Sequence, residues 1–268
     1  MANAGFWADL KAAQFRELPD NTIAVLPIGA IEQHGPHLPV SVDTDLVEAV
    51  SSQALQCLGA ELSVYVLPTL SITKSNEHNR HPGTLALSAE TLLAVLRDIG
   101  ASVARSGIQR LVLFNGHGGN TALLEVAARD LRVALDLIVA TCGWFAFADQ
   151  SAFDKDALAV DLHAGDLETS AMLALRPEHV DMSKAANFRT AMQDWQERSR
   201  FIGLTGEAAK PAWIIDDLCA DGACGNASAA TVEKGQALID SAARNFAEFL
   251  AEFARFDHRA VAGQQGND

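Results

Sequence analysis

The stretch TIAVLPIGAIEQHGPHLPVSVDTD, residues 22–45, joins a run of apolar residues directly to a cluster of acidic residues and histidines. Its first seven residues, with β-branched and large apolar side chains, are typical of a buried strand. Three further runs of this kind follow along the chain. We therefore expect strands over Thr22–Ile28, Leu62–Leu67, Arg110–Phe114 and Leu137–Thr141.

Longer amphipathic stretches separate and follow these runs. One of them opens with Ser88 before an acidic first turn, which indicates a serine cap. The pattern predicts helices over Asp45–Leu58, Ser88–Ser106, Asn120–Leu135, Asp166–Leu175 and Ala227–Phe256. Alternating strands and helices favour the α/β class, as a three-layer α/β/α sandwich with a mainly parallel central sheet. The chain has no internal repeat or low-complexity linker, so we expect residues 1–268 to form a single domain.

The composition is that of a globular protein, with 49% apolar and 20% charged residues in a chain of 268. The formal net charge of -14, without a basic patch, argues against binding to nucleic acid or to a membrane surface. Four scattered cysteines are too few for a disulfide framework. The sequence shows neither a signal peptide nor a transmembrane run, so we expect a cytoplasmic protein.

Polar residues collect where the predicted strands end. Glu32 and His34 follow the first strand two positions apart, so an extended backbone would project both side chains to the same side. The prolines and Gly35 then fold the chain back, which could return Asp43 to the same place. His117 follows the third strand within NGHGGN, residues 115–120. Because loops converge at the carboxyl ends of parallel strands, we expect these residues to meet.

A third polar group, Asp161, His163 and Glu168, lies before and within the helix predicted from Asp166. Histidines and carboxylates without cysteine fit a divalent ion such as zinc or manganese. Asp43 is suited to bridging two ions, because a carboxylate has two oxygens. Other interpretations stay open at this point: His117 could cap the following helix, and Glu32 and His34 could form a surface pair.

The segment Gly116–Asn120 also has an alternative interpretation, in which the glycines cradle a phosphate at a helix N-terminus and the chain is a nucleotide-binding module. The segment is neither G-x-G-x-x-G nor a Walker loop, and it lacks the lysine. As a nucleotide signal it is weak.

Four blocks of residues, taken together and in this order, resemble the creatininase (creatinine amidohydrolase) family. The blocks are EQHGPHLP with Asp43, NEH with HPGTL, NGHGGN, and HAG with ETS, and they run between about Ala24 and Arg176. The resemblance implies an α/β sandwich, a dinuclear zinc or manganese centre and hydrolysis of amide bonds, often in a cyclic substrate. It also implies a homo-hexamer.

The resemblance also implies roles for single residues. Glu32 and His117 would bind one metal, His34 would bind the other, and Asp43 would bridge both. His163 falls at the position of the catalytic histidine of the family. Its ordinary pKa near 6.5 would suit a proton shuttle to the leaving nitrogen, beside a metal-activated water.

Two positions depart from creatininase proper. Gly119 stands where that enzyme has a glutamate ligand, so we expect Glu168 to complete the second metal site and count it with His163 among the catalytic residues. Leu162 stands where creatininase has a glutamate before the catalytic histidine. Both changes fall near the substrate and argue against creatinine itself.

Three residues are candidates for substrate binding. Glu77 and His78 follow the second strand and could contact the substrate or support the metals. Trp144, with Phe145 and Phe147, follows the fourth strand and could form an apolar wall for a flat substrate, or belong to the core. A deformylase or a peptidase of the same family, acting on a formamide or a modified peptide, remains an alternative, as does a non-catalytic subunit.

Overall fold

A parallel sheet of five strands forms the centre of the molecule. The computed structural model describes residues 4–204 and 207–258. Neighbouring strands pair in the order β1-β3-β2-β4-β5, and every pair is parallel. The strands are β1 (Ala4–Phe6), β2 (Ile23–Ile28), β3 (Val64–Val66), β4 (Arg110–Asn115) and β5 (Ile138–Gly143).

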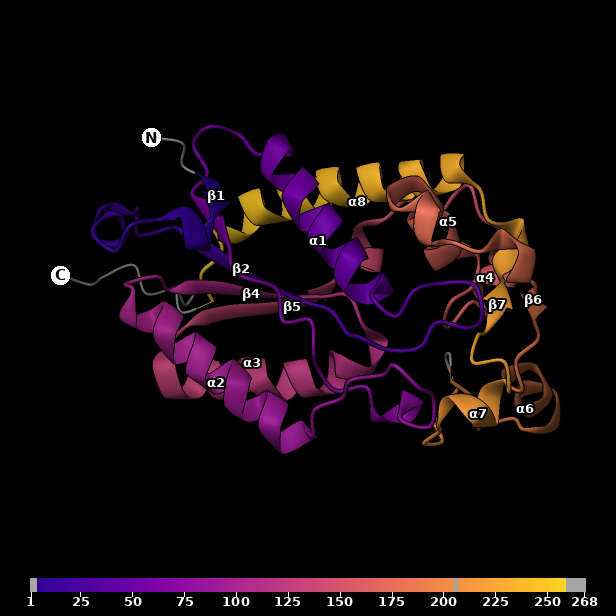
Figure 1. The fold of residues 1–268 in the computed structure, drawn as a ribbon. Helices are drawn as coiled ribbons and strands as arrows, with labels where there is room; N and C mark the ends of the chain where they lie inside the picture. The colour runs from indigo at the N-terminus through magenta and orange to yellow at the C-terminus, as the bar shows by residue number, and fades with distance from the viewer. Residues whose placement is uncertain (1–3, 205–206, 259–268) are drawn as a thin grey trace.

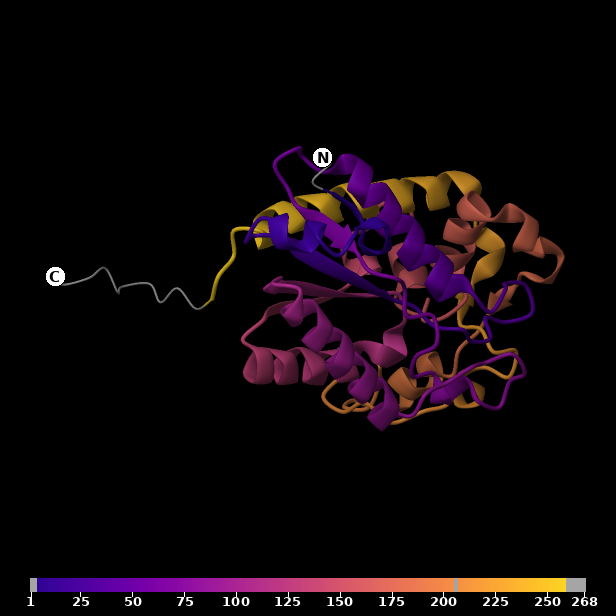
Figure 2. The same ribbon diagram turned by 60° about the vertical axis from the view of Figure 1, so that its left-hand side comes forward.

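Helices cover both faces of the sheet, which confirms the predicted three-layer sandwich. Figure 1 shows α1 (Val42–Cys57) and α8 (Val232–Phe253) on one face, and α2 (Ala89–Arg105) and α3 (Thr121–Leu135) on the other. The turned view in Figure 2 keeps the same division. Strand β2 supplies both cores alternately: Ile23 and Val25 pack in the core beneath α1 and α8, while Ala24 packs in the core on the opposite face.

Smaller elements gather beyond the carboxyl ends of β2, β4 and β5 (Figure 1). The helices there are α4 (Lys155–Leu158), α5 (Asp166–Leu175), α6 (Met192–Arg198) and α7 (Ile215–Leu218), and a second sheet pairs β6 (Asn187–Phe188) with β7 (Gly225–Asn226). Short 3-10 helices complete the chain: η1 (Trp7–Asp9), η2 (Gln14–Glu17), η3 (Asn76–His78), η4 (Gly118–Asn120), η5 (Trp144–Phe147), η6 (Pro177–His179), η7 (Met182–Lys184) and η8 (Ala227–Ala229).

Two helix starts differ from the prediction by more than one residue. Helix α1 begins at Val42 rather than Asp45, which places Asp43 in its first turn instead of in the preceding loop. Helix α8 begins at Val232 rather than Ala227, because Thr231 is its N-cap and its hydroxyl accepts a hydrogen bond from Lys234 N. Helix α8 ends at Phe253, and Phe256 beyond it is 53% exposed.

Phe246, Phe249 and Phe253 form a phenylalanine stripe along α8 that packs in the hydrophobic core. Phe246 is buried and stacks on Phe114 of β4 with 3.9 Å between ring centroids. Phe249 stacks in turn on Phe253, so the stripe packs α8 onto the sheet. In residues 4–204 and 207–258, no helix combines the length and the apolar character needed to cross a membrane.

Candidate metal centre and active-site cavity

Five of the predicted site residues meet at the carboxyl ends of the central strands. Glu32 and His34 follow β2, and Asp43 lies in the first turn of α1. His117 follows β4, and Glu168 lies in the first turn of α5. All five side chains are buried. Because buried charges need partners, five ionisable groups in one place indicate a functional cluster.

The first group of potential ligands combines Glu32, Asp43 and His117. His117 lies between the two carboxylates, with Nε2 3.3 Å from Glu32 Oε2 and Nδ1 3.3 Å from Asp43 Oδ2. Asn115, the last residue of β4, holds the His117 backbone: its amide donates to His117 O (2.6 Å) and accepts from His117 N (3.2 Å). The NGHGGN segment thus serves to place a histidine between carboxylates.

The second group combines His34, Asp43 and Glu168. His34 Nε2 lies 3.4 Å from Asp43 Oδ1 and 3.8 Å from Glu168 Oε2. Asp43 thus offers one oxygen to each group, which is the arrangement that a carboxylate bridging two ions requires.

Hydrogen bonds with backbone and side-chain groups outside the cluster fix the orientation of the ligand side chains. His34 Nδ1 donates to Glu32 O (3.0 Å), so Nε2 is the ring nitrogen that faces the cluster and can bind a cation once it has lost its proton. Ser75 donates to Glu32 Oε2, and Ala164 N donates to Glu168 Oε2 (2.6 Å).

Three of the atoms aimed into the cluster lack hydrogen-bond partners among the described residues. They are Glu32 Oε1, His34 Nε2 and Asp43 Oδ2, all fully buried. Buried polar atoms are normally paired, so this exception is the signature of a missing partner. Two carboxylate oxygens and an imidazole nitrogen are ligands that zinc and manganese accept. The residues present therefore fit divalent cations.

The same charges shift the ionisation of the cluster. Burial lowers the pKa of His34, but Asp43, Glu168 and Glu32 outweigh that effect and raise it to about 10. The pKa of His117 is likewise raised, by Glu32 and Asp43 against its burial. Burial raises the pKa of Asp43, yet the two histidines hold it well below its usual range. Protons on the imidazoles thus balance the carboxylates, and a divalent cation would take their place.

Metal binding should therefore release protons. Because His34 keeps its proton up to a pH of about 10, a cation at its Nε2 must displace that proton at neutral pH. We expect zinc affinity to rise about tenfold per pH unit for each proton released. Competition with a chelator at three pH values measures the slope. The exposed His179 provides the control, since His179→Gln should leave the slope unchanged; an affinity independent of pH would contradict the expectation.

His163 lies against both groups. Its ring is 4.2 Å from that of His34 and 4.5 Å from that of His78, between centroids. Nε2 donates to Gln33 O (2.8 Å), so Nδ1 carries the lone pair and lies 3.6 Å from Glu32 Oε1. The expectation of an ordinary pKa was wrong: burial and the positive charge of His34 hold the pKa of His163 well below 6.5.

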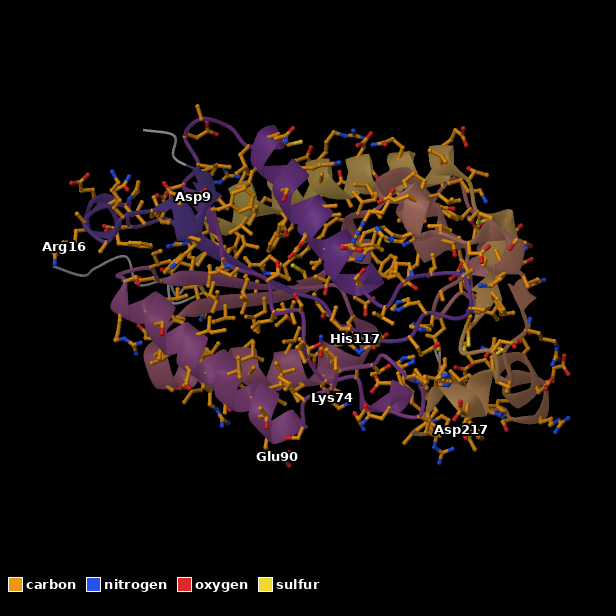
Figure 3. The ribbon with its side chains drawn as sticks, viewed as in Figure 1. Asp9, Arg16, Lys74, Glu90, His117 and Asp217 are labelled. Atoms are coloured by element: carbon orange, nitrogen blue, oxygen red, sulfur yellow. The ribbon has the colours of Figure 1, made fainter. Side chains whose placement is uncertain are left out.

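Glu77 and His78 also reach the cluster. Glu77 Oε1 lies 3.4 Å from His117 Nε2, and Lys74 pairs with its other oxygen at 3.4 Å. In Figure 3 the labelled Lys74 and His117 lie close together. His78 Nε2 lies 3.5 Å from Glu32 Oε1. Burial raises the pKa of Glu77, but His117 and Lys74 outweigh it and lower it to about 2, so this carboxylate is ionised.

The Glu77 carboxylate occupies the space beside Gly119. A Cβ atom at Gly119 would overlap Glu77 Oε1 and His117 Nε2, whereas a Cβ at the adjacent Gly118 would meet nothing within 4 Å. Gly119, without a side chain, therefore leaves room for the Glu77 carboxylate from another segment.

Gly119→Ala should weaken metal binding and hydrolysis, because its methyl group pushes Glu77 and His117 apart. A change in the residues around ligands commonly costs 10- to 100-fold, so we expect a loss of at least about tenfold. Gly118→Ala is the matched control and should leave zinc affinity close to that of the parent. Equal affinities for the two variants, measured by chelator competition, would refute this account.

A cavity of about 460 Å³ opens onto the cluster. Asp43, His117, His163 and Glu168 line one part of it. The lining also includes Phe145 and, from segments that the sequence analysis did not single out for substrate contact, Gln150, Leu158, Leu167 and Trp213. Trp144, a candidate for substrate binding, is instead fully buried in the core and stacks on Phe145 at 3.9 Å.

Gln33 is a site residue that the sequence analysis missed. Its side-chain amide donates to Gly222 O (2.8 Å) and contacts His78 Nδ1 at 2.8 Å. Its backbone oxygen accepts from His163, so one residue orients two histidines. Its position between Glu32 and His34 was the signal that could have identified it. An alternating strand pattern, however, places the Gln33 side chain on the side opposite to those of Glu32 and His34.

Comparison with known proteins identifies the family. The family model for creatininase, described as creatinine amidohydrolase, matches residues 8–250. The chain is 30% identical to creatinine amidohydrolase of Pseudomonas putida, over 92% of this chain and 94% of the relative. It is 35% identical to the mycofactocin precursor peptide peptidase of Mycobacterium tuberculosis, over 64% and 66%. A solved structure, "Creatininase Mn", superposes with a TM-score of 0.73 at 28% identity and covers 94% of this chain and 99% of that one.

These matches agree with the arrangement of the potential metal ligands beside the cavity. The two relatives are hydrolases by name, an amidohydrolase and a peptidase, and the family match extends over all the potential metal ligands described above. The chain belongs to the creatininase family of amidohydrolases.

Proposed function

We propose that the protein is a metal-dependent amidohydrolase that cleaves a C–N amide bond in a small substrate such as a cyclic amide. The observation that carries this proposal is the pair of ligand groups that share Asp43 at the floor of a cavity. Zinc or manganese bound there would lower the pKa of a water molecule and polarise the amide carbonyl. A manganese form of creatininase has the same fold, which supports this choice of metals.

In this proposal, different residues bind the metal ions, transfer the proton and contact the substrate. Glu32, His34, Asp43, His117 and Glu168 hold two ions. His163 handles the proton, because its Nε2–H is committed to Gln33 O and only Nδ1 is free to accept. A neutral imidazole at that position can take a proton from the attacking water and return it to the leaving nitrogen. Glu77 and His78 line the same cavity, which supports their assignment to substrate contact.

The substrate distinguishes this proposal from its nearest alternative. A peptidase or a deformylase would use the same ligands, and the mycobacterial relative is a peptide peptidase. Gly119 and Leu162 change the surroundings of the bond relative to creatininase proper, so we do not propose creatinine as the substrate.

The decisive experiment begins with metal analysis of the purified protein. Close to two zinc or manganese ions per chain are expected, followed by hydrolysis of at least one member of a panel of lactams, formamides and short peptides. Protein that neither carries a divalent metal nor takes up added zinc or manganese would refute the proposal.

We also propose, from the family alone, that the chain assembles into a homo-hexamer; a cytoplasmic location stays a prediction. Light scattering at micromolar protein should report six chains per particle. A monomeric mass would contradict the assembly while leaving the proposal about the metal centre intact.

A further inference from the structure

The cavity above the metal ligands has an apolar side that the hydrolytic chemistry does not use. Five large apolar residues line it, contributed by η5, α4, α5 and two loops: Phe145, Leu158, Leu162, Leu167 and Trp213. Leu162 is 37% exposed although it lies in this cavity. Apolar surface that the protein leaves uncovered in a concave site is typical of ligand contact.

Among the residues that the structure describes, the lining of this cavity has no cationic side chain apart from His117 of the metal-ligand cluster. Asp43, Glu77, Asp161 and Glu168 line it, and the lining within residues 4–204 and 207–258 includes neither lysine nor arginine. Lys74, a cation near this region, is paired with Glu77. Cations bound by Asp43 and Glu168 would offset the negative charge of the carboxylates at that end of the cavity. The apolar side of the cavity has no cation among the described residues that line it. An anionic group there would lose its hydration without gaining a partner.

Resting on the proposed function, we propose that the substrate is an amide with a bulky apolar group beside the scissile bond and without a phosphate or carboxylate on that group. The apolar group would occupy the side of the cavity lined by Leu162 and Trp213. A cavity of about 460 Å³ has room for such a group in addition to the amide.

Leu162 is the residue placed to set this selectivity. Leu162 and His163 both line the cavity, so the Leu162 side chain borders the place where the bond would be cleaved. The backbone of both residues is fixed by Cys224: Leu162 N donates to Cys224 O (3.1 Å), and Cys224 N donates to His163 O (2.7 Å). These bonds do not involve the Leu162 side chain, so its replacement leaves the position of His163 unchanged.

Binding of three hydroxamates to the zinc-loaded protein tests the inference without relying on turnover. The hydroxamate group chelates metal in all three, and only the arm differs: acetohydroxamate, phenylacetohydroxamate and 4-carboxyphenylacetohydroxamate. We expect the phenyl arm to bind about tenfold more tightly than the methyl arm, because burying an aromatic ring is favourable. The distal carboxylate, which is too far from the chelating group to reach the same metal, should cancel that gain.

Two substitutions of Leu162 sharpen the test. Leu162→Ala should reduce the preference for the phenyl arm, and Leu162→Lys should strengthen binding of the carboxyphenyl compound relative to the phenyl compound. Val133→Ala is the control, since Val133 is 81% exposed on α3, does not line this cavity and should keep the parent preferences.

The outcomes separate the inference from the function on which it rests. Equal affinities for the methyl and phenyl hydroxamates, or an undiminished affinity for the carboxyphenyl compound, would overturn the proposed substrate class while leaving the metal centre in place. Failure of all three hydroxamates to bind the zinc-treated protein would overturn the metal centre, and the inference with it.

Discussion

Asp43→Asn should deprive the protein of both metal ions. Asp43 directs one oxygen at His34 and the other at His117, so its carboxylate serves both ligand groups. An amide keeps the shape of the side chain but loses the negative charge and one acceptor oxygen. We expect bound zinc to fall from about two ions per chain to well under one, and the hydrolytic rate to fall at least about a hundredfold. Elemental analysis after gel filtration measures the first effect.

Asp45→Asn is the matched control for this prediction. Asp45 lies in the same first turn of α1, but its carboxylate pairs with Arg176 at 2.8 Å and accepts from Ser41 at 2.7 Å. The Asp45→Asn variant should therefore retain the metal content of the parent. His34→Ala should lose one ion and keep part of the other, so an Asp43→Asn variant that holds more metal than His34→Ala would contradict the bridging role.

The second large effect should come from replacing His163, and it should differ in kind from the effect of replacing Glu168. His163→Ala should keep the metal content of the parent while losing about a hundredfold or more in rate, as expected for a positioned acid–base group. Glu168→Gln should lower the occupancy of one ion along with the rate, because its carboxylate lies 3.8 Å from His34 Nε2. Metal content and rate are measured on both variants side by side.

His163 also forms a third potential ligand group with Glu32 and His34. The comparison therefore distinguishes a proton carrier from a metal ligand at this position. If His163→Ala strips metal while Glu168→Gln keeps both ions, the two roles are exchanged. The exposed His179 supplies the control: His179→Ala removes an imidazole from the surface and should change neither quantity.

Much of the fold and the location of the cluster could be predicted, because both depend on local patterns. Strand β2 is a continuous apolar run that is buried along its whole length, and such runs identify the strands of a covered parallel sheet. Glu32 and His117 follow two adjacent strands of that sheet, and the carboxyl ends of parallel strands necessarily lie at one edge. Strand β1 was not predicted, since three residues containing a glycine carry little strand signal.

The apolar side of the cavity could not be predicted, because its members come from segments that are distant in sequence. Trp213 and Phe145 line the same cavity although they are 68 residues apart in the sequence. Periodicity shows which face of an element is apolar but not whether another segment covers it. The same limit applies to Trp144, whose neighbour Phe145 reaches the cavity while Trp144 itself fills the core.

The bond from Gln33 to Gly222 O and the pairing of His163 with Cys224 tie the site to a segment nearly two hundred residues downstream of its first ligands. During synthesis, a growing chain would expose strands β1 to β5 long before residue 222 appears. Such an unfinished chain lacks α8, whose Phe246 stacks on Phe114 of the sheet, and it lacks the partners that Gly222 and Cys224 give to Gln33 and His163. The competent site is therefore a late product of chain elongation, because the helix that covers the sheet and the anchors of the proton carrier are all synthesised last.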